Sequence, residues 1–467
     1  MRKRFVACLS AFIFLFAVIP VSAQTATPSN GPVYIVQAGD TLWGIAIRFN
    51  VTVDEILAVN NMTNQDIFPG NQLIIPGLTG LSGTLITVPV PFGESLSSLS
   101  RQYRVDPSLL IKLNHIVSPE ELYAGYNLVL LQQDQQPALT ARTVLAKGET
   151  ILEMSVQQNT DPWTISQLNG LARPQEALPG DLLYLPSGST NAEPSGIPAV
   201  LSSALVDPLP IVQGETVQVK VIATQPVTLS GVLVDQPLHF FPLEDGSQVA
   251  LQGVYAMAEP GLYPLRIDVT LADGSVQSFE QMVLVASGNY KPETLSVDPS
   301  MIDPAVTGPE DAWLLGLVTP VTPEKYWQGA FQLPVANDPF CIKSGFGNRR
   351  TYNGGALLSF HSGLDFGVCS ATHPLDVYAP ADGVVVFTGL KTVRGNATII
   401  DHGEGIYSGL YHQAEIYVSV GDHVTAGELI GKIGDTGRVT GPHVHWDLWV
   451  SGIQVNPWTW YQEAFPN

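Results

Sequence analysis

Histidine is concentrated near the C-terminus of this 467-residue chain, and two pairs of residues there have a spacing that suits a metal site. Of the nine histidines, seven follow residue 340: His361, His373, His402, His412, His423, His443 and His445. His361 and Asp365 stand four residues apart, and His443 and His445 stand two apart. Even offsets place side chains on one face of a strand, and an offset of four also suits a helix. Imidazole and carboxylate are zinc ligands, and three of them leave a coordination position open for water.

The elements that must position these residues are predicted to be short strands separated by glycine-rich turns. The expected strands are residues 384–387, 397–400, 406–411 and 444–450. The C-terminal domain is therefore expected to be mostly β. Gly437 and Gly441 suit loops between such strands. Neither pair of possible ligands specifies a metal site alone, so the surrounding motifs decide how the pairs are interpreted.

These motifs resemble, in order and over residues 340–460, those of the lysostaphin/LytM-type zinc metallopeptidases (the duplicated hybrid motif). They are Ser344-Gly345-Phe346-Gly347-Asn348-Arg349, His361 with Asp365, Ala379-Pro380-Ala381-Asp382-Gly383, Asp401-His402-Gly403, Tyr411-His412, Val420-Gly421-Asp422 and Gly441-Pro442-His443-Val444-His445-Trp446. The resemblance implies that His361, Asp365 and His445 bind one Zn2+. It also makes His412 and His443 the catalytic histidines, and implies antiparallel sheets with a groove over the metal.

Such a ligand set suits hydrolysis of a peptide bond. A zinc-bound water has its pKa lowered to near 7 and can attack a carbonyl carbon. One further imidazole can take the water proton and pass it to the leaving amine, while another donates to the oxyanion. The sequence does not decide which of His412 and His443 plays which role. Asp447, two residues beyond His445, is a candidate acceptor that orients the His445 ring. The remaining histidines of this region, expected in turns and surface loops, are His373, His402 and His423.

The first residues predict export. Basic residues at 2–4 precede an apolar stretch at 5–19, which is followed by Pro20 and by small residues up to Ala23. This is the pattern of a secretory signal peptide, residues 1–23. An uncleaved membrane anchor is the alternative, but the apolar stretch is shorter than the ~20 residues that span a bilayer. We therefore expect a secreted or wall-associated protein with no membrane span after cleavage.

Two cysteines remain in the mature chain, Cys341 and Cys369. An exported location permits a disulfide between them. The separation of their Cα atoms decides whether the bond can form, and the sequence does not supply it. A disulfide and two free thiols are therefore both open at this point.

The N-terminal half contains a unit repeated three times, at a spacing of 54 or 55 residues. Each copy has a glycine–acid–hydroxyl triplet, an asparagine and a turn that ends in glycine. The triplets are Gly39-Asp40-Thr41, Gly93-Glu94-Ser95 and Gly148-Glu149-Thr150; the asparagines are Asn60, Asn114 and Asn169; the turns are Pro69-Gly70, Ala124-Gly125 and Pro179-Gly180. The apolar spacing predicts strand, helix, helix and strand in each copy. A unit this small has little core and is suited to presenting a surface.

The three copies resemble the LysM module, at residues 33–77, 85–132 and 142–187. The first copy is the most similar, whereas the position of Trp43 is Ser97 in the second copy and Leu152 in the third. The resemblance implies binding to glycans that contain N-acetylglucosamine, such as peptidoglycan. The positions implied to contact the sugar are Gly39, Asp40, Thr41, Pro69 and Gly70. The alternative is that these residues serve only helix capping and turn formation.

The middle of the chain is predicted to be a spacer. Residues 199–287 alternate apolar and polar side chains, as at Val217, Val219 and Val221, which predicts an immunoglobulin-like antiparallel β-sandwich. Residues 288–335 are rich in proline and are predicted to be a linker that docks on the last domain. The peptidase domain is expected at residues 336–467.

The composition narrows the function further. The chain has 21 basic and 42 acidic residues, a net charge of −21, which disfavours a nucleic-acid partner. The prediction is a secreted zinc metalloendopeptidase that cleaves peptide cross-links or stem peptides of bacterial peptidoglycan, held on the glycan by its LysM modules. The alternatives are a non-catalytic wall-binding protein, an activator of other wall hydrolases, or a structural wall protein. Neither the scissile bond nor the oligomeric state can be predicted.

The distribution of charge gives a prediction about wall binding. Residues 340–467 contain 7 basic and 11 acidic residues, so most of the acidic excess lies in the preceding modules. An acidic protein gains no steering from anionic wall polymers, so its retention must come from specific sugar contacts. We expect retention on insoluble peptidoglycan, measured by co-sedimentation, to hold or increase as salt is raised to about 0.5 M, where exposed charges are strongly screened. Loss of retention at modest salt would contradict this expectation.

Overall fold

The computed structural model forms two compact units, Met1–Leu85 and Ile86–Asn467. The residues that it describes are 31–78, 80–118, 121–132, 139, 141–145, 148–178, 181–186, 197–198, 200–336, 341–370, 372 and 374–466. The expected signal peptide, residues 1–23, lies outside this part of the chain. Among the described residues, none of the helices combines the length and the apolar character needed to cross a membrane.

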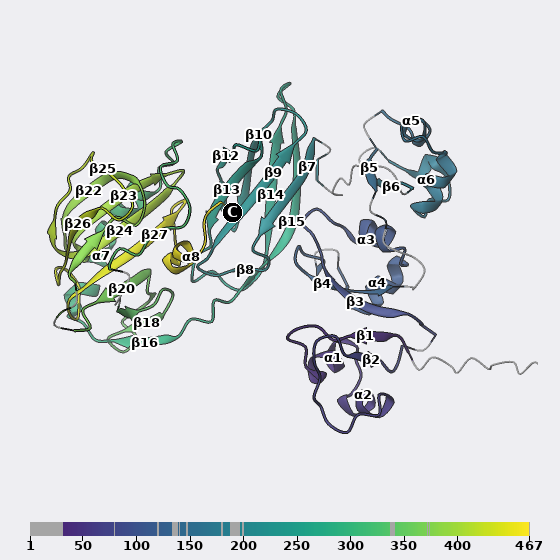
Figure 1. Cartoon of the computed structure of the whole chain (residues 1–467), viewed down its shortest axis with the longest axis horizontal. Coiled ribbons are helices and arrows are strands. Elements are labelled where there is room, and N and C mark those ends of the chain that lie inside the picture. The colour runs from purple at the N-terminus through teal and green to yellow at the C-terminus, as the bar shows by residue number, and fades with distance from the viewer. Residues whose placement is uncertain are drawn as a thin grey trace, which may run out of the picture. The chain divides into compact units, whose positions relative to one another are not determined.

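Each copy of the repeat folds in the predicted order of strand, helix, helix and strand (Figure 1). The first copy consists of β1 (Val33–Ile35), α1 (Leu42–Arg48), α2 (Val53–Val59) and β2 (Gln72–Ile74). The second consists of β3 (Thr84–Pro89), α3 (Leu96–Tyr103), α4 (Pro107–Asn114) and β4 (Asn127–Gln132). The third consists of β5 (Arg142–Val144), α5 (Ile151–Gln157), α6 (Pro162–Leu168), η2 (Pro174–Glu176) and β6 (Leu182–Tyr184). The hydroxyl of each triplet caps the first helix, as its sequence position predicts.

The repeated asparagine joins the second helix to the closing strand. In the third copy, Asn169 Nδ2 donates to the carbonyls of Ile165 and Tyr184, both at 2.8 Å, and its Oδ1 accepts from the Tyr184 amide at 2.7 Å. Asn60 and Asn114 make the same three bonds in the other copies. The side-chain amide therefore pairs with the strand as a neighbouring backbone would, which explains its recurrence at a fixed spacing.

Residues 201–286 form a β-sandwich of nine strands, which confirms the predicted architecture. One sheet has the order β11-β10-β14-β15-β8 and the other β12-β13-β9-β7. The strands are β7 (Leu201–Asp207), β8 (Ile211–Val212), β9 (Thr216–Ala223), β10 (Thr228–Leu233), β11 (Gln236–Leu238), β12 (Phe240–Pro242), β13 (Gln248–Gly253), β14 (Gly261–Thr270) and β15 (Val276–Ala286). Val217, Val219 and Val221 are all buried in the core between the sheets, as period-two alternation requires.

The segment expected to be a proline-rich linker is instead largely ordered against the C-terminal domain. It contains β16 (Pro292–Leu295), η3 (Pro299–Ile302) and the fifteen-residue helix α7 (Pro304–Val318). Leu314 and Val318 of α7 are buried against the C-terminal sheet. Pro304 occupies the first helical position, where proline is favoured, so the proline content misleads as a sign of an extended linker.

The C-terminal domain is mostly β, as predicted, and is built on one large sheet. Its main strand order is β17-β20-β27-β24-β23-β22-β25, while β16 joins a small sheet with β18 and β19. The elements are β17 (Ile342–Ser344), β18 (Arg349–Tyr352), β19 (Leu357–Phe360), β20 (Gly363–Gly367), β21 (Asp376–Tyr378), β22 (Gly383–Lys391), β23 (Gly395–Gly403), β24 (Ile406–Ile416), β25 (His423–Val424), β26 (Leu429–Ile433), β27 (His443–Val450), β28 (Ile453–Val455) and α8 (Pro457–Gln462). Cys341 and Cys369 form a disulfide with Cα atoms 5.9 Å apart, which settles the alternative left open by the sequence.

The sandwich is packed directly on the C-terminal domain. Val249 and Leu251 of β13 belong to the same buried cluster as Leu364 of β20. Polar contacts cross the same boundary: Trp460 Nε1 of α8 donates to Thr216 Oγ1 at 2.8 Å. Figure 1 shows α8 between the two sets of strands. These two domains therefore share one core, and the sandwich is more than a spacer.

This shared core predicts a difference between two glycines of the sandwich. A Cβ at Gly253 would lie 2.8 Å from Ile453 Cβ and from Val455 Cγ1, whereas a Cβ at Gly261 would meet nothing within 4 Å. We expect Gly253→Leu to lower the apparent Tm of the full chain by several degrees, because overpacking costs ~1–3 kcal/mol. The matched control, Gly261→Leu, should leave Tm almost unchanged in calorimetry. Equal Tm values for the two variants would show that the domains are not held by this contact.

Candidate metal centre and glycan-binding loops

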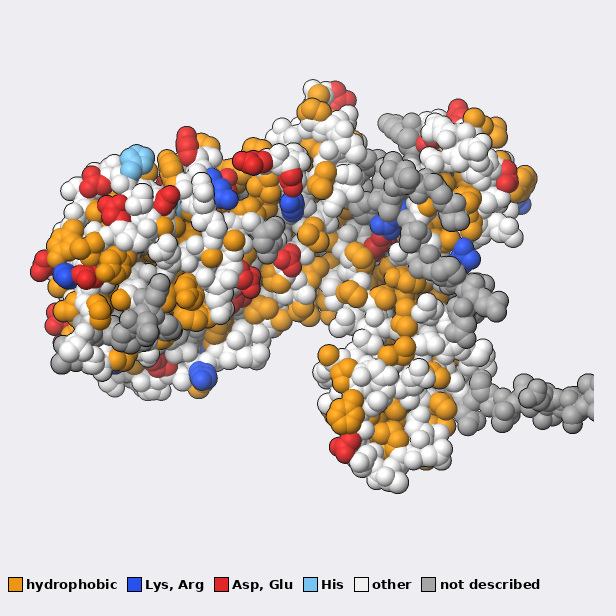
Figure 2. Space-filling view, in the orientation of Figure 1, with side chains coloured by type: hydrophobic (Ala, Val, Ile, Leu, Met, Phe, Trp, Pro, Cys, Tyr) orange, Lys and Arg blue, Asp and Glu red, His pale blue; other side chains and the backbone are white. Residues whose placement is uncertain are grey.

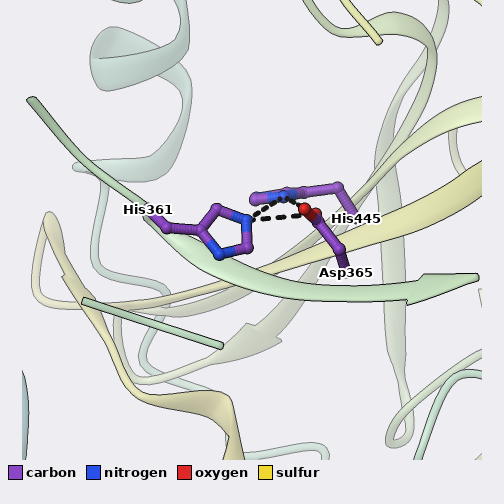
Figure 3. Close-up of side chains that lie close together, drawn as sticks. All are labelled: His361, Asp365 and His445. Atoms are coloured by element: carbon purple, nitrogen blue, oxygen red, sulfur yellow. Dashed lines mark hydrogen bonds and ion pairs between the residues drawn. The ribbon is translucent and has the colours of Figure 1, made fainter. Parts of the chain in front are cut away.

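Two neighbouring strands of the large sheet bring Asp365 and His445 together. Strands β20 and β27 are antiparallel, and Asp365 lies directly opposite His445 in their register. Directly opposed residues share one face of a sheet. His361, which lies two residues before β20, completes the group (Figure 3). All three side chains are buried, so the centre is built into the domain.

Three potential ligand atoms converge at this centre. His361 Nε2 lies 3.0 Å from Asp365 Oδ1 and 3.1 Å from His445 Nδ1, and that Nδ1 lies 2.8 Å from Asp365 Oδ1. Ligand atoms lie ~2.0–2.2 Å from a zinc ion, so atoms that bind one ion must be within a few Å of one another. The three residues named from the sequence therefore suit one zinc ion by chemical type and by convergence.

The outer nitrogen of each ligand histidine is held by a hydrogen bond that sets its tautomer. His361 Nδ1 donates to the Gly345 carbonyl at 2.7 Å, which leaves the Nε2 lone pair directed at the centre. His445 Nε2 donates to Asp447 Oδ1 at 2.6 Å, so Nδ1 is the nitrogen that faces the centre. Bonds of this kind fix the ring and raise its basicity as a ligand. Asp447 thus occupies the orienting position that its spacing from His445 predicted.

The second oxygen of Asp365 faces Arg350, which the sequence reasoning missed. Arg350 Nη2 lies 3.5 Å from Asp365 Oδ2, and its Nε donates to Glu293 Oε2 of β16 at 2.8 Å. Arg350 directly follows the Ser344–Arg349 motif, but nothing in its spacing links it to Asp365. Its contact leaves Oδ1 of the carboxylate for the centre.

Burial and charge act against each other at the centre. Burial lowers the pKa of His361. It acts in the same direction on His445, yet Asp447 and Asp365 outweigh it and raise the pKa of His445 to about 9. Burial also opposes ionisation of Asp365, but His361 and His445 hold the pKa of that carboxyl well below its usual range. The surroundings therefore favour positive charge next to the carboxylates, a condition that a divalent cation meets.

His412 reaches the same face of the sheet through a β-bulge. Between β23 and β24, Thr398 pairs with Leu410 and Asn396 pairs with Gln413, so β24 carries one extra residue there. His412 lies in this bulge with a φ of +65°, an unusual value for a residue other than glycine. Adjacent strand residues normally point to opposite faces. The bulge allows Tyr411 to stack on His445 while the His412 ring lies 4.8 Å from the ring of His443.

The two remaining candidate histidines have the same tautomer. His412 Nδ1 donates to the Thr436 carbonyl and His443 Nδ1 donates to the Gly441 carbonyl, each at 2.8 Å. Each ring therefore keeps the lone pair on Nε2. His443 Nε2 lies 3.6 Å from Asp365 Oδ1, beside the ligand atoms. Burial, followed by the neighbouring His443 and His445, lowers the pKa of His412 to about 3, so this ring is neutral at neutral pH.

The other histidines of the domain lie away from this group. His402, expected in a turn, is instead buried in β23, where its ring bonds the Asp382 carbonyl and Ser408 Oγ at 2.8 and 2.9 Å. His423 is exposed on the short strand β25. His373 lies outside the described residues.

The five positions expected to contact glycan lie on two turns of the first repeat. Gly39 and Gly70 have φ values of +87° and +88°, which glycine adopts without strain. Asp40 Oδ2 accepts from Tyr34 Oη and from the Gln37 amide, each at 2.8 Å. The Thr41 hydroxyl accepts from the Gly44 amide at the start of α1, and Pro69 precedes Gly70 in the second turn. Capping and turn geometry thus account for most of these residues, and sugar contact stays a prediction.

Two family models match parts of the chain. Residues 359–457 match peptidase family M23, and residues 34–76 and 90–130 match the LysM domain. The first stretch contains the three candidate ligands and both of the further histidines, His412 and His443.

The curated relatives are similar over limited stretches. The peptidoglycan DD-endopeptidase ShyA of Vibrio cholerae serotype O1 is 39% identical over 129 residues, 28% of this chain and 29% of ShyA. The DD-carboxypeptidase/endopeptidase Mpg of Neisseria meningitidis serogroup B is 40% identical over 97 residues, 21% of this chain and 22% of Mpg. This chain thus matches less than a third of the length of either relative. The catalytic domain of lysostaphin from Staphylococcus simulans is 27% identical with a TM-score of 0.23, covering 26% of this chain and 92% of that domain. The C-terminal part of this chain is a domain of peptidase family M23, and LysM domains precede it.

Proposed function

We propose that this protein is a zinc metalloendopeptidase of the cell envelope, exported by the segment at residues 1–23, that cleaves peptide cross-links or stem peptides of bacterial peptidoglycan. The observation that carries the proposal is the convergence of three ligand atoms, from His361, Asp365 and His445, beside two histidines that are each anchored through Nδ1 to a backbone carbonyl. The name of ShyA, a peptidoglycan DD-endopeptidase, supports this substrate class for the domain, and the name of Mpg, a DD-carboxypeptidase/endopeptidase, supports the reaction type.

The ligand residues would hold one zinc ion through His361 Nε2, Asp365 Oδ1 and His445 Nδ1. When bound, zinc supplies Lewis acidity that polarises the peptide carbonyl and lowers the pKa of water. Asp447 and the Gly345 carbonyl keep the two imidazoles in the tautomers that can bind a metal. Arg350 keeps the second oxygen of Asp365 occupied, so the carboxylate offers a single oxygen.

His412 and His443 would move the protons of the reaction. Each ring is anchored through Nδ1 to a backbone carbonyl, so each can accept a proton on Nε2 without turning. Once protonated, the same nitrogen can donate to the leaving amine or to the developing oxyanion. The two rings are anchored alike, so the geometry leaves their division of roles open.

The LysM domains would keep the enzyme on its substrate. Binding to glycan raises the effective concentration of the attached peptides near the peptidase domain. Figure 2 shows charged side chains scattered over the visible face without a continuous basic patch. This distribution supports recognition by specific sugar contacts over attraction to anionic polymers.

Removal of either proton-transferring histidine should abolish hydrolysis. We expect His443→Ala and His412→Ala to lower the rate of peptidoglycan clearing about 100-fold or more in a zinc-supplied zymogram, because general acid–base groups contribute about 10²–10⁴. His423→Ala, which changes an exposed histidine of the same domain, is the control and should retain full activity. A chelator should stop clearing, and added zinc should restore it.

The outcome separates the proposed enzyme from its alternatives. Failure of the wild-type protein to clear peptidoglycan with zinc supplied, together with identical behaviour of His443→Ala, would favour a non-catalytic wall-binding protein or an activator. For an active enzyme, the masses of products from defined muropeptides would distinguish cleavage of cross-links from cleavage of stem peptides.

The orienting role of Asp447 can be tested through metal affinity. Asp447 is buried, and its oxygens accept from His445 Nε2 and from Gln454 Nε2. We expect Asp447→Asn to weaken zinc binding by about 10- to 100-fold in competition titrations, because loss of the charge makes His445 a poorer ligand. Asp401→Asn, which changes another buried aspartate of the domain, should keep wild-type zinc affinity. Equal affinities for both variants would limit Asp447 to a structural role.

A further inference from the structure

The second LysM copy departs from the other two at the loops that would face glycan. Phe92 stands where the first copy has Ala38 and the third has Lys147. Ala124 stands where the first copy has Pro69 and the third has a proline as well. The departures cluster on one face of the module, which suggests that this face has a separate task.

The backbone of these loops is hydrogen-bonded to β15 of the sandwich. The Gly93 amide donates to Gln281 Oε1 at 2.7 Å, and Gln281 Nε2 donates to the Glu94 carbonyl at 3.3 Å. The Ala124 amide donates to the Met282 carbonyl at 3.0 Å. A proline at position 124, as in the other copies, could not make this last bond because it has no N–H.

Side chains from the same loops enter the core of the sandwich. Phe92 and Ala124 are buried in the cluster that also contains Val283 and Val285 of β15. The Phe92 ring meets the ring of Phe279 edge-on, with centroids 5.1 Å apart. Phe92 therefore fills a hydrophobic site in the sandwich core. An alanine at this position would leave the site partly empty, and a lysine would place a charge in it.

The acidic residue of the second triplet also contacts another module. Glu94, the counterpart of Asp40, is buried and forms an ion pair with Arg142 of β5, in the third copy. It also accepts from Ser98 Oγ at 2.5 Å. In the first copy, by contrast, the Asp40 carboxylate accepts from Tyr34 and Gln37 of its own module. The loop face of copy two thus contacts both modules that follow it in the chain, the third copy and the sandwich.

The other two copies keep large apolar side chains on the corresponding positions. Trp43 and Phe68 of the first copy are 69% and 67% exposed, and Leu152 and Leu178 of the third are 62% and 65% exposed. The second copy has Ser97 in place of Trp43. Exposed apolar side chains beside polar turns are the surface that a sugar ring can stack on.

We propose that the second LysM module is an adaptor that packs on the sandwich and contacts the third module, and that glycan binding comes from the first and third modules. This inference rests on the proposed function, in which the LysM domains hold the protein on glycan. A cleft of about 550 Å³ remains between the loops of copy two and β15, lined among others by Ser97, Val117 and Phe279. Occupation of this cleft by glycan is the competing outcome that the experiment must separate.

Double variants of the full chain test which LysM modules bind glycan. We expect Trp43→Ala combined with Leu152→Ala to weaken co-sedimentation with insoluble peptidoglycan at least tenfold. The matched pair in the cleft of copy two, Ser97→Ala with Val117→Ser, should change the affinity less than twofold. An equal loss in the second pair would overturn the adaptor role. No retention of the wild-type chain would instead refute the proposed tether, so the two failures are distinguishable.

Variants that weaken the contact between the loops of copy two and β15 give a second test, which is measured by hydrogen exchange. Ala124→Pro restores the proline of the other copies, and Phe92→Ala restores the residue of the first copy. Each should speed hydrogen exchange in β15 and in the loop at residues 92–95 while leaving glycan affinity unchanged, with circular dichroism as the check on folding. A severalfold gain in affinity would reveal a masked sugar site and overturn the proposal. Unchanged exchange would show that the loop does not hold the modules together, which also overturns it.

Discussion

The antiparallel register between β20 and β27 is the constraint on which the candidate active site depends. It places Asp365 opposite His445, and the strands approach so closely that a Cβ at Gly363 would lie 2.1 Å from a backbone oxygen of β27. A shift of one residue would turn His445 to the other face of the sheet. Asp447 forms an ion pair with His445, and Arg350 forms one with Asp365, so both of these buried residues have a partner of opposite charge.

The bulge that presents His412 depends on a second constraint, which comes from outside the matched peptidase stretch. The His412 amide donates to the Arg394 carbonyl at 2.9 Å. The amides of Val393 and Arg394 in turn donate to the carboxylate of Glu310 on α7, at 2.9 and 3.0 Å. Asp311 holds the Arg394 side chain at 2.8 Å. The segment that precedes the peptidase domain therefore supports the backbone that carries a catalytic candidate.

Sequence spacing predicted those features that a regular strand or helix preserves. Even offsets singled out His361 with Asp365 and His443 with His445 as candidates, and the surrounding motifs decided how they were interpreted. The strand argument applies to His443 and His445 of β27, whereas His361 lies before β20. The repeat was visible because Asn60 and its two counterparts each replace a backbone partner, a role with little tolerance for other residues. The same reasoning misread α7, because Pro304 occupies the first helical position, where proline is tolerated, and the helix also accommodates Pro309 in its interior. It also gave no reason for His412 to share a face with His445, since an extra residue in β24 is invisible to periodicity.

The way the modules are joined bears on what a glycan tether can contribute. A tether raises effective concentration only when both sites can be engaged at once. The sandwich shares a core with the peptidase domain through Leu251 and takes Phe92 of the second LysM module into its own core. The sandwich, the peptidase domain and most of the second LysM module lie in one compact unit, whereas the first LysM module lies in the other. Under the proposed function, the packed contacts of Phe92 and Leu251 would connect the second LysM module to the peptidase domain through folded interfaces as well as through the chain.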